Sequence, residues 1–317
     1  MIDSFFRIHP LAFYAFMSLA FLTIIAKAGD YIIFSMSDYA KKLGISDYLI
    51  GLVVISIGTA TSEMVASVTG TLMGNSGIVF GTVLGSSLCK LPIIGLGFII
   101  AKKIKIKKHF SGKTPKLALI IAAMPMILVI DGVLSRTDGI LLLLVFALYL
   151  MTLWQGEGKL GKIKRDVSFR KIWQSALIFS FALAALLYSA RWLVFSSLQI
   201  SEILNVPPLI VGLVVLGIGS SMPELAVQIK SIKKKHVDIA MGNVFGSIVA
   251  NSVLVLGVVA IIRPVSIDVM NLVLSSISLI AGLVYLAYLM KKGEANWKHG
   301  IVLILFYVLV IAAAFYF

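Results

Sequence analysis

Two stretches of the chain are gapless copies of each other, which restricts the fold to an internally duplicated one. Residues 51–90 read GLVVISIGTATSEMVASVTGTLMGNSGIVFGTVLGSSLCK, and residues 212–251 read GLVVLGIGSSMPELAVQIKSIKKKHVDIAMGNVFGSIVAN. A shift of 161 positions (Glu224 minus Glu63) superimposes the two stretches, and the register continues upstream, where residues 11–40 match residues 172–201. A gapless match of this length predicts two copies of one structural unit.

The apolar content of the chain exceeds what a soluble core can bury. Of 317 residues, 60% are hydrophobic and only 13% are charged, and the mean hydropathy is +1.04. Lipid must therefore solvate much of the surface, which predicts an integral membrane protein. The one cysteine, Cys89, lies in an apolar run, so the sequence carries no disulfide framework and no cysteine-based metal site.

Ten apolar segments approach the length of about 20 residues that a helix needs to cross a bilayer. We therefore expect an all-α membrane protein of ten transmembrane helices, in which residues 1–154 form an N-terminal five-helix repeat and residues 171–317 a C-terminal one. Residues 155–170 would be a cytoplasmic linker, too short for a regulatory domain. The expected spans are residues 11–38, 48–70, 77–101, 116–133, 138–154, 172–199, 208–230, 239–262, 268–290 and 299–317.

Basic residues concentrate in alternate connections between these spans, most clearly in residues 102–116, 159–171 and 230–235. The positive-inside rule makes those loops cytoplasmic and both termini extracellular, in a multi-pass protein of the cell membrane. Because each copy has an odd number of spans, the second copy must be inverted relative to the first. The net charge of +14 thus reflects topology and contact with membrane lipid rather than nucleic-acid binding.

Glu63, Glu224 and Lys90 lie deep inside their expected spans, and Lys27, Asp30 and Arg191 lie in the first helix of each half. A charge at that depth costs at least about 2.5–3.5 kcal/mol on insertion scales, so each side chain needs a partner or a hydrated cavity. The two glutamates occupy equivalent positions, which indicates an ion site. A buried Glu63–Lys90 ion pair that only fastens two helices is the structural alternative.

The segments before the glutamates, residues 58–63 and 219–224, have the composition of helix breaks. Glycine loosens the backbone, Pro223 removes a hydrogen-bond donor, and the freed carbonyls and small hydroxyls can replace the water shell of a hard cation. Ser86 and Lys90 are four residues apart, as are Ser247 and Asn251, so each pair lies on one helix face. Both faces are expected to point toward the breaks.

The motifs GSSMPEL (residues 219–225) and DIAMGNVFGS (residues 238–247) closely follow patterns of the sodium/calcium exchanger family of cation antiporters, GTSxPEL and DIAxGNxxGSN. The chain therefore resembles that family, more specifically in its second half than in its first. The resemblance implies ten helices in two inverted repeats with broken helices at the ion site. It also implies alternating access, in which the first and sixth helices slide across a rigid core.

The resemblance further implies an ion-binding set that includes the carboxylates of Glu63 and Glu224 and the amide of Asn251. Sodium and calcium would be the transported ions, with no bound cofactor. The remaining members would be hydroxyls, and main-chain carbonyls near Ser56 and Gly217. The hydroxyls would come from Thr59, Ser86, Ser220, Ser221 and Ser247.

The first half departs from the family pattern where the site is formed. Ala60 replaces a hydroxyl residue, Ser62 a proline, Thr82 an asparagine, and Lys90 an asparagine that faces the site. An ammonium directed at two carboxylates would change the net charge of the site from minus two to about minus one. At an effective dielectric constant near 20, the ammonium would repel a divalent ion about 5 Å away with an energy of several kcal/mol.

Three hypotheses follow. The protein exchanges Ca²⁺ or a related cation for Na⁺, with Lys90 altering the site; or it is a proton-coupled or monovalent cation antiporter in which Lys90 replaces a bound cation or releases its proton. In the third, a Lys90–glutamate bridge locks a non-transporting protein. The sequence shows no nucleophile and base that would indicate an enzyme, and no obligate protein partner is evident.

Overall fold

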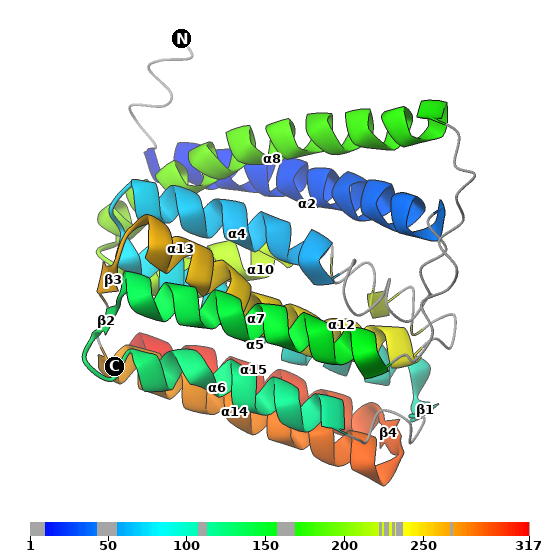
Figure 1. Cartoon of the computed structure of the whole chain (residues 1–317). Coiled ribbons are helices and arrows are strands. Elements are labelled where there is room, and N and C mark those ends of the chain that lie inside the picture. The colour runs from blue at the N-terminus through cyan, green and yellow to red at the C-terminus, as the bar shows by residue number, and fades with distance from the viewer. Residues whose placement is uncertain are drawn as a thin grey trace.

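The computed structural model describes residues 10–42, 56–106, 113–156, 169–221, 224, 228, 229, 232, 237–266 and 269–316. Over these residues the chain is almost entirely helical, and most of the helices run along a common direction (Figure 1). The first half contains α2 (Pro10–Lys42), α4 (Ser56–Leu72), α5 (Ser76–Ala101), α6 (Lys113–Leu128) and α7 (Arg136–Gly156).

The second half contains the corresponding helices, two of which include π-helical turns. The helix that begins at Pro208 passes from α9 through the π-helical η3 into α10, and the helix that begins at Val237 passes from α12 through the π-helical η4 into α13. The elements are α8 (Phe169–Leu204), α9 (Pro208–Val211), η3 (Gly212–Leu216), α10 (Gly217–Ser220), α12 (Val237–Val249), η4 (Ala250–Val255), α13 (Leu256–Ile262), α14 (Val269–Lys292) and α15 (Trp297–Tyr316).

These helices coincide with the ten expected apolar spans, which confirms an all-α membrane protein. Within the described residues, six helices are long and apolar enough to cross a bilayer, and Pro115–Leu128 and Pro208–Ser220 are shorter apolar helices. The first part of the expected span 48–70 and most of the last part of 208–230 lie outside the described residues, as does most of the linker 155–170.

Two short antiparallel ribbons establish how the halves are related. β1 (Lys103–Lys105) pairs with β4 (Glu294–Asn296), and β2 (Val133–Leu134) pairs with β3 (Val265–Ser266). The shift of 161 positions places β1 on β3 and β2 on β4, so each ribbon joins one half to the other. The equivalent strands β1 and β3 lie at opposite ends of the helices (Figure 1), and the two halves are therefore inverted repeats.

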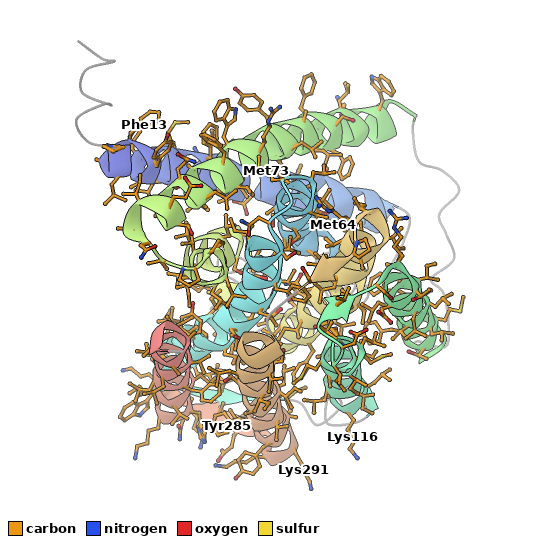
Figure 2. All side chains as sticks on the ribbon, turned by 90° about the vertical axis from the view of Figure 1, so that its left-hand side faces the viewer. Phe13, Met64, Met73, Lys116, Tyr285 and Lys291 are labelled. Atoms are coloured by element: carbon orange, nitrogen blue, oxygen red, sulfur yellow. The ribbon has the colours of Figure 1, made fainter. Side chains whose placement is uncertain are left out.

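α2 and α8, the equivalent first helices of the two halves, form a layer of their own. They cross each other above the remaining helices, many of which are seen close to end-on in Figure 2. Ile25 of α2 and Leu186 of α8 belong to an apolar cluster distinct from the main core, and the hydroxyls of Ser18 and Ser196 meet at 2.9 Å. Most of the buried apolar side chains of α5, α12, η4 and α13 belong to the main core beneath this layer.

Glycines bring α5 into backbone contact with the second half. A Cβ atom on Gly85 would overlap the carbonyl oxygen of Leu213, and one on Gly217 would lie 2.8 Å from the Cα atom of Gly85. Gly81 faces the carbonyl oxygen of Leu209 in the same way. A side chain at these positions would push the helices apart, so the glycines hold α5 against η3 and α10, next to the site described below.

Candidate ion-binding site

The helix that carries the second-half motif ends where the sequence predicts a break. α10 stops at Ser220, and Ser221 has φ −86° and ψ 2°, outside the helical region. The carbonyl oxygen of Gly217 accepts hydrogen bonds from the hydroxyls of Ser221 (2.9 Å) and Ser220 (3.4 Å). The hydroxyls thus lie on the last turn of the helix, directly before Glu224.

The first half differs, and the expected break at residues 58–63 is wrong for the part of α4 that the structure describes. α4 runs without interruption from Ser56 through Glu63 to Leu72. The sequence difference explains this: Ser62 keeps the backbone N–H that Pro223 lacks at the equivalent position, so the helical ladder continues. Among the described residues, the irregular backbone at the site therefore comes from the second half.

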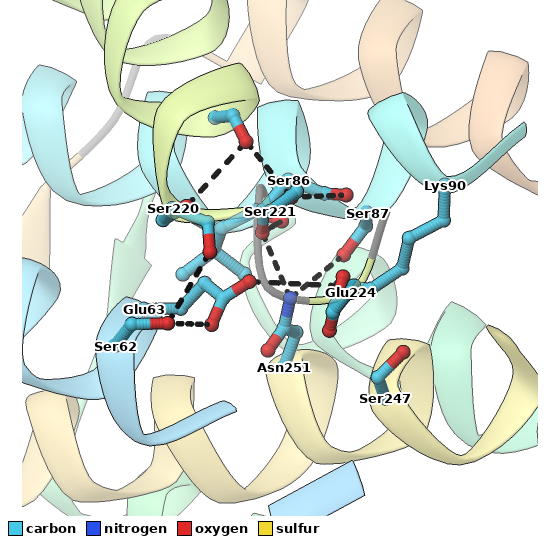
Figure 3. A network of polar contacts seen from close by, with 12 residues as sticks. Ser62, Glu63, Ser86, Ser87, Lys90, Ser220, Ser221, Glu224, Ser247 and Asn251 are labelled. Atoms are coloured by element: carbon cyan, nitrogen blue, oxygen red, sulfur yellow. Dashed lines mark hydrogen bonds and ion pairs between the residues drawn. The ribbon is translucent and has the colours of Figure 1, made fainter. Parts of the chain in front are cut away.

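The side chain of Lys90 of α5 extends toward the two glutamates (Figure 3). Its Nζ atom is 3.3 Å from Oε2 of Glu224 and 3.8 Å from Oε1 of Glu63, and all three side chains have zero solvent exposure. With all three side chains ionised, the site carries a net charge of minus one. One ammonium thus bridges carboxylates from both halves of the chain.

Hydroxyl and amide groups connect the helices around these charges. Ser62 donates to Oε2 of Glu63 at 3.0 Å and to the carbonyl oxygen of Ser220 at 3.3 Å, which ties α4 to α10. The amide nitrogen of Asn251 donates to the hydroxyl oxygens of Ser86 (2.8 Å) and Ser87 (3.4 Å), which ties η4 to α5 (Figure 3). Hydrogen bonds thus connect residues of both halves around the buried charges.

Among the site residues predicted from sequence, Glu63, Glu224, Lys90, Asn251, Ser86, Ser220 and Ser221 meet in this network. The hydroxyl of Ser247 instead bonds the carbonyl oxygen of Asn243 in its own helix at 2.6 Å. Ser56 and Thr59 lie in α4, but their side chains are outside the described part of the structure.

Two members of the network, Ser62 and Ser87, were not among the predicted site residues. Ser62 adjoins Glu63, and its hydroxyl stands where the family pattern has proline. Ser87 follows the predicted Ser86 directly. Their positions beside Glu63 and Ser86 do not by themselves identify them as site residues. Many small hydroxyl residues in this chain lie on apolar helices and bond only their own backbone, as Thr69 and Thr71 do.

The donor set suits a hard cation. Carboxylate, hydroxyl, amide and carbonyl oxygens are the ligands that Na⁺ and Ca²⁺ accept. Within the described residues, no three His, Cys, Asp or Glu side chains come together as a dedicated metal centre would require. The geometry therefore provides two carboxylates and neutral oxygens.

A membrane-embedded pair of carboxylates where two inverted repeats meet defines a secondary transporter of cations rather than an enzyme. The sequence model of the family described as "Sodium/calcium exchanger protein" matches residues 13–155 and 174–316, one match in each half. Together these ranges cover most of the chain. The protein belongs to the sodium/calcium exchanger family, whose members are cation antiporters.

Similar proteins include the inner membrane protein YrbG of Escherichia coli (strain K12), which is 30% identical over 78% of this chain and 79% of its own length. The sodium/calcium exchanger MaX1 of Methanosarcina acetivorans is 27% identical, with 93% of this chain and 96% of that protein covered. A solved structure of the sodium-calcium exchanger NCX_Mj, soaked with Na⁺ and Sr²⁺, has the same fold, with a TM-score of 0.69 and 23% identity over 96% of this chain and 99% of that one.

Proposed function

We propose that this protein is a secondary active antiporter that exchanges Ca²⁺ or a related cation for Na⁺, and that it binds its cations between Glu63 and Glu224. The observation that carries the proposal is the convergence of these two fully buried carboxylates, one from each inverted repeat, on one point. A buried carboxylate pair is costly unless cations compensate it, and a transporter supplies those cations in turn.

Neutral oxygen atoms near the carboxylates of Glu63 and Glu224 would complete the proposed set of ligands. Ca²⁺ takes six to eight oxygen ligands, and Na⁺ accepts the same donor types. The carbonyl oxygens of Gly217 and Ser220 already serve as acceptors in the network, so they lie within the polar part of the site. The other proposed contributors are Ser56, Thr59, Ser86, Ser220, Ser221, Ser247 and Asn251.

Alternating access would use the separate layer formed by α2 and α8. A Cβ atom on Gly219 would overlap Leu22 of α2, so α2 lies directly on the helix that ends at the site. A shift of this layer would uncover the carboxylates from one side and then from the other, while the glycine-packed core stays fixed. We place both termini outside and the basic loops in the cytoplasm, with residues 1–154 and 171–317 as the two repeats.

The test is calcium-45 uptake by liposomes that contain the purified protein, driven by an outward Na⁺ gradient. We expect uptake by the wild type, and uptake at the level of empty liposomes for Glu63→Gln and Glu224→Gln. Glu202→Gln is the matched control, because Glu202 is exposed at the end of α8. Normal uptake by the two site variants would contradict the proposed ligands. The absence of cation uptake by wild type under Na⁺ and proton gradients alike would support a locked, non-transporting protein instead.

A further inference from the structure

Two amide side chains, Gln228 and Asn243, are buried near the carboxylates without a protein partner. Neither side chain is exposed to solvent. The Oε1 and Nε2 atoms of Gln228 and the Oδ1 and Nδ2 atoms of Asn243 form no hydrogen bond with the described residues. A buried polar group without a partner destabilises the fold, so such groups usually contact a ligand or ordered water. Neither amide is among the proposed cation ligands.

Both amides lie one helical turn away from the proposed ligands. Gln228 follows Glu224 by four residues, and the residues of that segment that the structure describes (224, 228, 229 and 232) are helical. Asn243 precedes Ser247 by four residues in α12, and its carbonyl oxygen accepts the hydrogen bond from the Ser247 hydroxyl. In the sequence, the connection 230–235 joins these two helical segments, so both amides lie between the site and that connection.

The amides lie on the side of the site that faces the basic loops. A Cβ atom on Gly97, near the end of α5 that leads into β1, would overlap the side chain of Ile232, so the segment that carries Gln228 extends toward this end. α12 also lies toward the end of the helices where β1 pairs with β4 (Figure 1). The connection 230–235 is rich in lysine. We place this end of the molecule in the cytoplasm.

The other side of the site has hydroxyls at the equivalent positions. The shift of 161 positions relates Gln228 to Ser67 and Asn243 to Thr82, and both hydroxyl residues are buried. The Thr82 hydroxyl donates to the carbonyl oxygen of Ile78 in its own helix at 2.7 Å, whereas the Ser67 hydroxyl has no partner among the described residues. Because the repeats are inverted, these hydroxyls lie on the side that we place outside the cell.

Water satisfies the two amides better than an ion does. Each amide has a carbonyl oxygen that accepts hydrogen bonds and an NH₂ group that donates them. A cation would satisfy only the oxygens, and an anion would satisfy only the NH₂ groups. A water molecule both donates and accepts, and buried waters typically make about three hydrogen bonds to such groups.

We infer that Gln228 and Asn243 bind the water molecules that hydrate the transported cation on its way between Glu224 and the cytoplasm. A hard cation that leaves the carboxylates must regain its water shell, and the amides hold water one turn away. They carry no charge, so they do not retain the cation. They are positioning residues of the ion path, which act through water. This inference rests on the proposed carboxylate site and identifies the cytoplasmic branch of its ion path.

Thiol accessibility tests the inference without transport. Cys89 is the only cysteine of the chain, so in a Cys89→Ala background each of Gln228→Cys, Asn243→Cys and Ser67→Cys carries a single thiol. A membrane-impermeant methanethiosulfonate reagent is applied to inverted membrane vesicles, whose cytoplasmic face is outside, and to right-side-out vesicles. We expect Gln228→Cys and Asn243→Cys to react at least ten-fold faster in inverted vesicles, and the control Ser67→Cys to react faster in right-side-out vesicles.

Reaction of the denatured variants verifies that each thiol is present. Thiols at positions 228 and 243 that do not react preferentially from the cytoplasmic face would overturn the inference. This result is independent of the carboxylate site. Calcium-45 binding that persists in Glu63→Gln and Glu224→Gln would instead remove the proposed function.

Binding and flux measurements distinguish a water-filled path from simple packing. Gln228→Leu and Asn243→Leu remove the groups that bind water, so we expect the rate of calcium-45 uptake into liposomes to fall about ten-fold. Equilibrium calcium-45 binding in detergent should not change, because the amides do not contact the bound ion. Asn243→Thr, which copies Thr82 of the other half, should retain more uptake than Asn243→Leu. Wild-type uptake by both leucine variants, or a loss of calcium binding in folded leucine variants, would overturn the inference.

Discussion

The two halves of the molecule build one scaffold around the site but give it different charges. Each contributes a buried glutamate from an equivalent position, Glu63 or Glu224. The halves differ at another pair of equivalent positions in the site, where the first half has Lys90 on α5 and the second half has Asn251 on η4. The duplicated backbone thus decides where the side chains meet, and one divergent position decides the charge of the site.

The halves also differ in backbone regularity. α5 is α-helical from Ser76 to Ala101, while its counterpart contains the π-helical turn Ala250–Val255, and the helix before the second glutamate contains the π-helical turn Gly212–Leu216. π-Helical turns are frequent at functional sites because they disturb the regular hydrogen-bond ladder. Among the residues described in both halves, the second half therefore supplies the irregular backbone at η4, and the first half supplies the extra charge at Lys90.

The comparison predicts that a second lysine at the equivalent position abolishes transport. In Asn251→Lys, two ammonium groups would cancel both carboxylates, and cation uptake into liposomes should fall at least ten-fold, to background. The double variant Lys90→Asn/Asn251→Lys restores one lysine and should regain part of the uptake. Unchanged uptake by Asn251→Lys would mean that the two positions do not share one site.

Because the backbones of the two halves are in contact at Gly85 and Gly217, we expect replacement of either glycine by alanine to destabilise the protein. In Gly85→Ala the new Cβ atom would overlap the carbonyl oxygen of Leu213, so the free energy of unfolding should fall by about 1–3 kcal/mol. Gly217→Ala should behave similarly. In Gly70→Ala the Cβ atom would meet the Cγ2 methyl groups of Ile78 and Val79, at 2.9 and 3.3 Å, rather than the backbone of the other half, so we expect a smaller loss. Thermal unfolding in detergent measures all three, and an equal loss for Gly70→Ala would contradict the account.

A carboxylate at the amide position should move the site toward divalent ions. Asn251→Asp adds a third acid opposite Lys90, and we expect the apparent affinity for Ca²⁺ to rise about ten-fold, or ~1.4 kcal/mol. The concentration dependence of calcium-45 uptake measures this change. Asn205→Asp, on the exposed loop after α8, is the control that should leave the affinity unchanged. A lower affinity in Asn251→Asp would place Asn251 outside the ion site.

The smallest expected effect concerns the hydroxyl that links the halves beside Glu63. Ser62→Ala removes bonds to Glu63 and to the carbonyl oxygen of Ser220, and should cost about 0.5–1.5 kcal/mol of unfolding free energy. Ser266→Ala, exposed in β3, serves as the matched control. Equal unfolding temperatures for the two variants would show that this link between α4 and α10 contributes little.

Sequence reasoning located the repeats, the helices and the buried charges because each depends on local composition and spacing. The gapless register of residues 51–90 on 212–251 and the length of the apolar runs are sufficient for the inverted layout. The bonds from Asn251 to Ser86 and Ser87 depend on the distance between halves, which no local pattern encodes. The same holds for the continuous α4, where one change from proline to Ser62 outweighed the breaking tendency of the neighbouring glycine.

Anomalous diffraction from crystals soaked with Sr²⁺, a hard divalent ion that stands in for Ca²⁺, would show whether the two buried glutamates bind the cation. We expect an anomalous peak between the carboxylates of Glu63 and Glu224 with Lys90 withdrawn from them, and a stronger peak at the same place in Lys90→Asn. A wild-type structure with the ammonium still between both carboxylates and Sr²⁺ bound elsewhere, together with an empty site in Lys90→Asn, would contradict this expectation.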